Sequence, residues 1–292
     1  MSENLLDNLD VFYGELTPAR ATVYARLEGL ENASGLSLAG FVRGPRCFYS
    51  TTLLSTYPLS DAGPGPSLLA KALVPDPCYW SPETPNIYDV TVELCRGNDI
   101  IASDVRQIGF KPLGISGRFF TWEGKPWVLR GVTKQSTTEE DFALWRAQCA
   151  VLCQRPLAGI EVEMCRASEQ GVLCFCSLPL QDLFGEDRVV NYLRKLVRFP
   201  AVAIIVSQRP LHKKLQRTAP NLLFVQEEMD EFDASTLLLG KAERADALQT
   251  VNLPVIIHRS LSHPLEIAEA RAACDKLQAD LAPYGQFAGY IV

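Results

Sequence analysis

The sequence predicts two domains, an antiparallel β-sandwich over residues 1–112 and a closed barrel of eight parallel strands with covering helices over residues 113–292. Short alternating strands separated by turn residues fill the first part of the chain, a pattern typical of an antiparallel sandwich. After Pro112 the pattern changes to continuous apolar runs that alternate with helical stretches. Such a change indicates parallel strands whose two faces are both buried.

The expected strands of the first domain are short, and glycine and proline residues separate them. They are Val11–Tyr13, Ala21–Leu27, Gly40–Val42, Tyr49–Leu53, Ser67–Ala70, Tyr88–Leu94 and Ile100–Ala102. Aromatic side chains in such strands are expected in the core, and less often on the surface as a platform for a sugar. The aromatic residues placed in the core on this basis are Phe12, Tyr13, Phe48, Tyr49 and Tyr79.

The second domain shows eight apolar runs, the number that a closed barrel requires. They are Val128–Val132, Ala150–Gln154, Val172–Cys176, Ala201–Ser207, Leu222–Gln226, Thr236–Gly240, Pro254–His258 and Phe287–Val292. Helices are expected over residues 139–148, 160–170 and 264–281, and Gly171 is a suitable C-cap for the second. Roughly 180 residues is below the usual lower bound of about 200 for this barrel. Shortened loops, and with them a shallow or absent substrate pocket, are therefore expected.

The composition describes a packed globular protein, with 47% hydrophobic and 21% charged residues. A net charge of −6 without a long basic run argues against nucleic acid and anionic membrane as partners. No apolar run approaches the ~20 residues of a membrane span, and no signal peptide is visible, so we expect a cytoplasmic protein. Several of the nine cysteines, such as Cys174 and Cys176, sit in apolar strand-like runs and are expected to be reduced core thiols and not metal ligands. Without a glycine-rich phosphate loop, no cofactor is expected.

Three motifs follow one another where the two domains join. They are W-S-P-E-x-P-x-x-Y at residues 80–88, V-R-Q-I-G-F-K at 105–111 and G-K-P-W-V-L-R-G-V at 124–132. In this order they resemble glycoside hydrolase family 2, the family of β-galactosidases, β-glucuronidases and β-mannosidases. The resemblance implies an immunoglobulin-like sandwich followed by a minimised, degenerate TIM barrel, and a hydrolase of O-glycosyl bonds in carbohydrate metabolism. Weaker similarity at Cys165–Leu173 and Arg198–Ile205 extends it through the barrel.

The same resemblance implies two catalytic glutamates, at the ends of barrel strands four and seven, that act as acid and nucleophile. Here Arg209 and Pro210 stand near the first position and Arg259 near the second. The nearest acidic residues are too distant for a slip of one or two positions to restore either glutamate. Loss of both removes acid catalysis, typically worth 10²–10⁴-fold, and the covalent route. We therefore expect an inactive homologue of a glycosidase.

A relocated active site is the first alternative. Glu227 and Glu228 open an acidic run at the end of the fifth expected strand, on the side of the barrel where catalysis takes place. A hydrolase would need two of these carboxyl groups in one cleft. The simpler interpretation is a solvated acidic loop.

Non-catalytic binding of a carbohydrate, or a scaffold role with a protein partner, is the second alternative. The candidate binding residues, all at expected strand ends, are His258, Arg259, Gln208 and Lys134. His258 beside Arg259 would hold an anionic group such as a uronate or a phosphate, unless both simply form an ion-paired barrel rim. Sugar sensing predicts that Trp145 or Phe184 is exposed at this face, whereas a scaffold predicts an exposed apolar patch.

Overall fold

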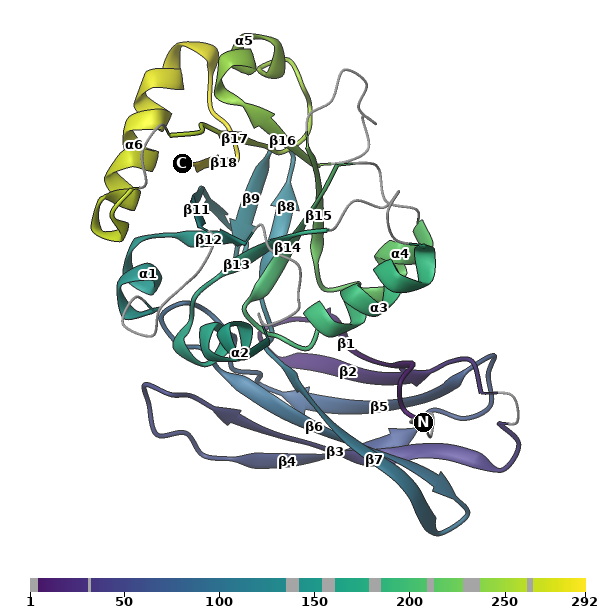
Figure 1. The fold of residues 1–292 in the computed structure, drawn as a ribbon. Helices are drawn as coiled ribbons and strands as arrows, with labels where there is room; N and C mark the ends of the chain where they lie inside the picture. Colours follow the sequence, from purple (N-terminus) through teal and green to yellow (C-terminus); the bar gives the residue numbers. More distant parts are fainter. Residues whose placement is uncertain are drawn as a thin grey trace. The chain divides into compact units, whose positions relative to one another are not determined.

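The computed structural model describes residues 5–30, 33–134, 142–153, 161–178, 185–208, 213–227, 237–261 and 265–292 (Figure 1). The chain divides into two compact units. The first comprises Met1–Phe110 together with Val197–Pro200, and the second comprises Lys111–Leu196 and Ala201–Val292. The short segment Val197–Pro200 therefore belongs to the first unit, although it lies in sequence between a helix and a strand of the second.

The first unit is an antiparallel β-sandwich, as the sequence predicts. Its strands are β1 Leu9–Leu16, β2 Arg20–Leu27, β3 Leu36–Arg46, β4 Ser55–Asp61, β5 Leu68–Pro75, β6 Ile87–Arg96 and β7 Asp99–Ile108. They are hydrogen-bonded in the order β1-β2-β5-β4-β3-β6-β7. Strand β4 pairs with β3 over five residues but with β5 only at Ser60 and Asp61, so the sheet divides there into two layers.

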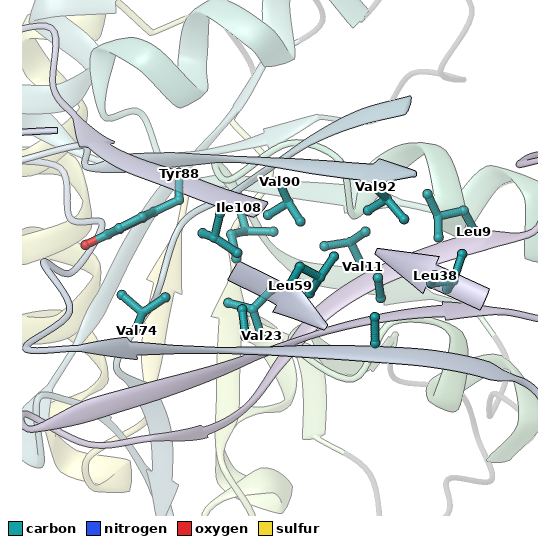
Figure 2. Close-up of a cluster of buried hydrophobic side chains, with 14 of the residues drawn as sticks. Leu9, Val11, Val23, Leu38, Leu59, Val74, Tyr88, Val90, Val92 and Ile108 are labelled. Atoms are coloured by element: carbon teal, nitrogen blue, oxygen red, sulfur yellow. The ribbon is translucent and has the colours of Figure 1, made fainter. Parts of the chain in front are cut away.

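The core of this unit lies between the two layers (Figure 2). Period-two alternation explains it, because every second residue of a strand points to the same face. In β2, for example, Ala21, Val23, Ala25 and Leu27 are buried while the residues between them are not. Val23 and Leu38, from opposite layers, are fully buried. Complete burial of one such side chain contributes about 1.5–3 kcal/mol.

One predicted strand of this unit is wrong. The segment Tyr49–Leu53 has β-forming residues but no alternation of buried and exposed positions, and strand β4 begins only at Ser55. Phe48 and Tyr49 are 69% and 41% exposed, so the expectation that they lie in the core is also wrong. Their rings pack edge to face against each other, with the ring centroids 5.1 Å apart.

The W-S-P-E motif forms a compact turn inside the first unit. Trp80 is fully buried, and its backbone N–H donates to the carbonyl of Phe110 at 2.9 Å. The Ser81 hydroxyl accepts a hydrogen bond from the backbone N–H of Thr84 at 3.1 Å. Gly109 of the second motif lies against the indole, because an added Cβ would approach Trp80 Cβ to 2.7 Å. The two motifs are therefore halves of one packing arrangement.

The second unit begins with a three-stranded antiparallel meander that the sequence analysis did not separate from the barrel. Its strands are β8 Leu113–Ser116, β9 Phe119–Trp122 and β10 Lys125–Trp127. Phe120 is fully buried, and the rings of Trp122 and Trp127 lie 5.6 Å apart. The Arg118 guanidinium donates to the backbone carbonyl of Gln249 at 2.8 Å, which holds the meander to the barrel.

Eight parallel strands then close a barrel, and all eight predicted strands are confirmed. They are β11 Leu129–Lys134, β12 Ala150–Cys153, β13 Cys174–Ser177, β14 Val202–Ser207, β15 Leu223–Glu227, β16 Leu237–Lys241, β17 Val255–His258 and β18 Gly289–Ile291. Each strand pairs with the next, and β18 closes the ring against β11. This is the fold class expected from the sequence, a β-sandwich followed by a TIM-type barrel.

Helices lie around the outside of the strand ring (Figure 1). They are α1 Phe142–Gln148, α2 Glu161–Gln170, α3 Glu186–Leu196, α4 Lys213–Thr218, α5 Ala245–Leu248 and α6 Ala270–Leu281, with short 3-10 turns at Ala242–Arg244, Ile267–Glu269 and Ala282–Tyr284. The three predicted helices correspond to α1, α2 and α6, within the described residues. Gly171 follows α2 with φ of +75°, which confirms the predicted C-cap.

Candidate functional site

Arg130 shows which face of β11 is turned outward. Its guanidinium binds Asp275 and Gln278 of α6, and the distance from Nη2 to Gln278 Oε1 is 3.0 Å. Successive side chains of a strand point to opposite sides of a barrel wall. Gly131 and Thr133 therefore face the barrel interior.

The pairing of the parallel strands shows which residues on the neighbouring strands also face the barrel interior. Gly131 is paired with Ile291, Ile291 with His258, and His258 with Lys241. Paired residues on neighbouring parallel strands point to the same side of a sheet. His258 and Lys241 therefore also face the interior, at the carboxyl end of their strands.

The same reasoning places two more polar side chains at this end. Leu239, two residues before the end of β16, is paired with Glu227. Val206 of β14 is paired with Val225, two residues before Glu227, and Gln208 follows Val206 by two residues. The inward polar residues at the carboxyl ends, called the mouth cluster below, are Thr133, Gln208, Glu227, Lys241 and His258.

His258 is half-buried in the mouth cluster. Its Nε2 lies 3.4 Å from Thr133 Oγ1. Burial lowers the pKa of the imidazole below 6.5, Lys241 acts in the same direction, and the Glu243 carboxylate opposes both. The ring is consequently neutral at pH 7, where it can both donate and accept a hydrogen bond.

Glu227 is the acidic member of the mouth cluster. Burial raises the pKa of its carboxyl group above 4.5, while a hydrogen bond from Gln208 and the Lys241 ammonium act against this rise. A carboxyl group with a raised pKa is what a general acid requires. Glu228, its predicted partner, lies outside the described residues, so the structure does not show the two carboxyl groups in one cleft.

Arg259 does not join the mouth cluster. Its Nη1 binds Asp280 Oδ2 of α6 at 2.7 Å, and its backbone N–H donates to the carbonyl of Ile291 at 2.9 Å. The guanidinium thus points to the helical side of the barrel wall, opposite to His258. The structure does not bring the two residues together as an anion-binding pair.

The other predicted site residues are placed as follows. Gln208 is exposed and contacts Glu227. Lys134 is the last residue of β11, where its backbone is paired with Cys153. Trp145 of α1 is only 1% exposed, which counts against an aromatic sugar platform at this residue. Arg209, Pro210 and Phe184 lie outside the described residues.

Sequence reasoning missed Thr133, Lys241 and the nearby Glu243 as candidates. Lys241 directly follows the sixth apolar run, Thr236–Gly240. A polar residue at the carboxyl end of a predicted barrel strand was the signal that would have found it. Thr133 stands at the corresponding place after the first run.

No group of three or more histidine, cysteine, aspartate or glutamate side chains suited to a metal ion occurs in the described parts of the chain. Within the same residues, no helix has the length and apolar character needed to cross a bilayer.

Comparison with known proteins shows that this chain is similar to glycoside hydrolases. Residues 52–111 match the model of the family described as glycosyl hydrolases family 2. A β-galactosidase of Klebsiella pneumoniae is 38% identical over 61 residues, which are 21% of this chain and 6% of that protein. A β-galactosidase of Leuconostoc mesenteroides is 28% identical over 123 residues, 41% of this chain and 12% of that protein.

Solved structures resemble nearly the whole chain. A Bifidobacterium dentium β-glucuronidase in complex with coumarin-3-O-glucuronide has a TM-score of 0.65 at 13% identity, over 97% of this chain and 59% of that chain. A glycosyl hydrolase family 2 member from Bacteroides cellulosilyticus has a TM-score of 0.65 at 14% identity, over 98% of this chain and 45% of that chain. The molecule therefore has the fold of a β-glycosidase. The resemblance of the chain to glycoside hydrolase family 2 is thereby confirmed. The chain spans 59% and 45% of these two structures and a far smaller share of the curated relatives, 6% and 12%.

Proposed function

We propose that this chain is a catalytically inactive homologue of the family 2 glycoside hydrolases, in the lineage of enzymes that hydrolyse O-glycosyl bonds in carbohydrate metabolism. The observation that carries the proposal is the state of Arg259. It stands near the position of the seventh-strand nucleophile, and its guanidinium is bound to Asp280 at 2.7 Å on the helical side of the wall. The nitrogen lone pairs of a guanidinium are delocalised over a planar group, so it is no nucleophile toward an anomeric carbon.

The end of the fourth strand supports the same conclusion. Gln208 carries an amide and is hydrogen-bonded to Glu227. The next two residues in sequence, Arg209 and Pro210, lack a carboxyl group as well. Retaining hydrolysis requires an acid and a nucleophile about 5–5.5 Å apart, and neither is present at its family position.

A relocated hydrolase is the second candidate, and the raised pKa of Glu227 is the observation that favours it. Glu227 would be the proton donor, since a carboxyl group with a raised pKa is protonated nearer to neutral pH. A second carboxyl group would have to act as nucleophile, and Glu228 is the candidate in sequence. Hydrolysis by this route requires both Glu227 and Glu228.

An inactive barrel retains a non-catalytic role, in which it binds or senses a carbohydrate or serves as a scaffold for a protein partner. The mouth cluster supplies a hydroxyl, an amide, a carboxylate, an ammonium and an imidazole, which are the donors and acceptors that sugar hydroxyl groups use. We also propose a cytoplasmic location, because free thiols are typical of a reducing compartment, and Cys47, Cys78, Cys95, Cys149 and Cys274 are free thiols.

The test is hydrolysis of a panel of activated aryl glycosides and glucuronides. The wild-type protein is assayed beside Glu227→Gln/Glu228→Gln, with a competent family 2 β-glucuronidase as positive control. We expect no turnover above the buffer rate from either form of this protein. Turnover that the double substitution abolishes would establish the relocated site instead, and turnover that survives it would contradict both proposals.

A further inference from the structure

Two cysteines from distant parts of the sequence meet on the outside of the barrel. Cys149 lies between α1 and β12, and its backbone N–H donates to the carbonyl of Trp145 at 3.0 Å. Cys274 lies in α6, is fully buried, and its Sγ donates to the carbonyl of Gly131 in β11 at 3.2 Å. The thiol of Cys149 is hydrogen-bonded to the thiol of Cys274. The register of the strands also places them together, because Ala150, the residue after Cys149, is paired with Gly131, whose carbonyl Cys274 contacts.

The surroundings of this pair favour one reactive thiolate. The hydrogen bond from Cys149 lowers the pKa of Cys274, the Arg130 guanidinium acts in the same direction, and burial opposes them. The same hydrogen bond raises the pKa of Cys149, against the effect of Arg271 and Arg130. Loss of a single proton thus leaves the negative charge on Cys274. A thiolate, and not a thiol, is the nucleophile in disulfide exchange.

The pair also lies where the first and last strands of the barrel meet. Strand β11 pairs with β18, so the barrel closes there between its first and last strands. Cys274 belongs to the helix that precedes β18, and Cys149 directly precedes β12. A bond between them would tie the last helix of the barrel to its first strand–helix unit, across the line of closure.

We propose that Cys149 and Cys274 are a redox-sensitive dithiol, which a low-molecular-weight disulfide oxidises to a bond that fastens the barrel closure. Half-buried Cys149 meets the reagent first. The Cys274 thiolate takes the Cys149 proton while the Cys149 sulfur attacks the reagent's S–S bond. The expelled small thiolate then takes that proton, which restores the Cys274 thiolate. The Cys274 thiolate then attacks the Cys149 sulfur and expels the second. The protein loses two electrons and two protons, and the reagent is reduced to two thiols.

The experiment uses the full chain incubated with excess oxidised glutathione, followed by alkylation of the remaining thiols and peptide mass spectrometry without reduction. Of the nine thiols, we expect two to be lost, in a single cross-linked peptide pair that contains Cys149 and Cys274. Because a cross-link restricts the unfolded chain, the melting temperature is expected to rise by roughly 5 °C and to return after dithiothreitol.

Three variants make the result decisive. Cys95→Ser is the matched control: Cys95 is also half-buried, its thiol contacts the carbonyl of Glu93 in its own strand at 3.9 Å, and the variant should behave as wild type. Cys149→Ser should lose the cross-link and the temperature shift. Cys274→Ser should stop at a glutathione adduct on Cys149. Nine unmodified thiols in the wild type, a stable mixed disulfide on Cys149, or pairing of Cys149 with another cysteine would overturn the proposal.

Discussion

At the end of β17, His258 and Arg259 are adjacent in sequence but belong to different parts of the barrel. The alternation of a strand turns His258 toward Thr133 in the interior and Arg259 toward Asp280 on α6. Two neighbouring residues that the sequence alone would assign to one anion site are thus separated by the barrel wall. Although Arg259 stands near the expected nucleophile position in sequence, its side chain is turned away from the barrel interior.

Replacement of Arg259 by Gln tests this structural role. Both partners of its ion pair are partly exposed, at 33% and 41%, so solvent screens the interaction. We expect a loss of about 0.5 kcal/mol or less in the free energy of unfolding, measured by urea denaturation. Asp280→Asn should cost a similar amount, and the double variant no more than either alone. A loss of several kcal/mol in Arg259→Gln would show that the residue does more than join the strand end to α6.

The pH response of His258 is a second prediction at this scale. Since burial lowers the pKa of His258 in the folded state, this imidazole binds a proton more readily in the unfolded chain than in the folded chain below pH 6.5. The stability of the wild type should therefore fall as the pH drops below about 6.5, and fall less in His258→Gln. An NMR titration that uses this variant for assignment should place the His258 pKa below 6.5. A value above 6.5 would show that Glu243 outweighs burial.

Among the elements, the turn that contains Trp80 shows how sequence motifs encode packing. Gly109 has no Cβ, and this allows its backbone to lie against the Trp80 side chain and Pro200. Added Cβ contacts of 2.7 Å and 2.9 Å to these residues are shorter than packing allows. The family resemblance in this region therefore has a physical basis within the first unit.

Gly109→Ala should destabilise the protein by about 1–3 kcal/mol, the usual cost of overpacking. Gly65→Ala is the matched control, because its added Cβ would meet its nearest atom at 3.7 Å, an ordinary contact. Urea denaturation of both variants measures the difference. Equal stability of the two would contradict the packing described for Gly109.

The sequence predicted the barrel strands better than the sandwich strands, for a reason that lies in their burial. A parallel strand covered on both faces appears as an unbroken apolar run, as in Val202–Ser207, where every residue is buried. Strand β4, Ser55–Asp61, has only Leu59 fully buried, and the β-forming residues just before it were taken for the strand instead. The short strands β8 to β10 lack both signals and were not separated from the barrel.

The candidate site was predictable only in part. Polar residues at strand ends identified His258, Gln208 and Glu227 from the sequence. Which of them share the interior depends on strand register, and one position of slip reverses every side chain. For this reason the sequence alone groups Arg259 with His258, whereas Lys241 does carry the signal of a polar residue at a strand end. The contact of Cys149 with Cys274 follows from barrel closure and has no signal in the local sequence.

For the whole molecule, the fold resembles that of glycosidases, whereas the residues at the expected site lack the chemistry of glycosidases. The chain has the sandwich and the closed barrel of β-glycosidases, with TM-scores of 0.65 to two of them. By the resemblance in sequence, the residues expected near the two catalytic positions are Arg209, Pro210 and Arg259. Function depends on the site and not on the fold, so the account predicts a barrel without the hydrolytic chemistry of its relatives.

The most direct test is covalent labelling by a mechanism-based glycosyl aziridine, which traps the nucleophile of a retaining glycosidase before turnover. Intact-mass spectrometry of the labelled full chain, beside a competent family 2 enzyme, reports one added glycosyl group per nucleophile. The account predicts no mass increase in this protein under conditions that label the control completely. A single adduct on a carboxylate, at Glu227, Glu228 or elsewhere in the barrel, would contradict the central claim and identify the active site.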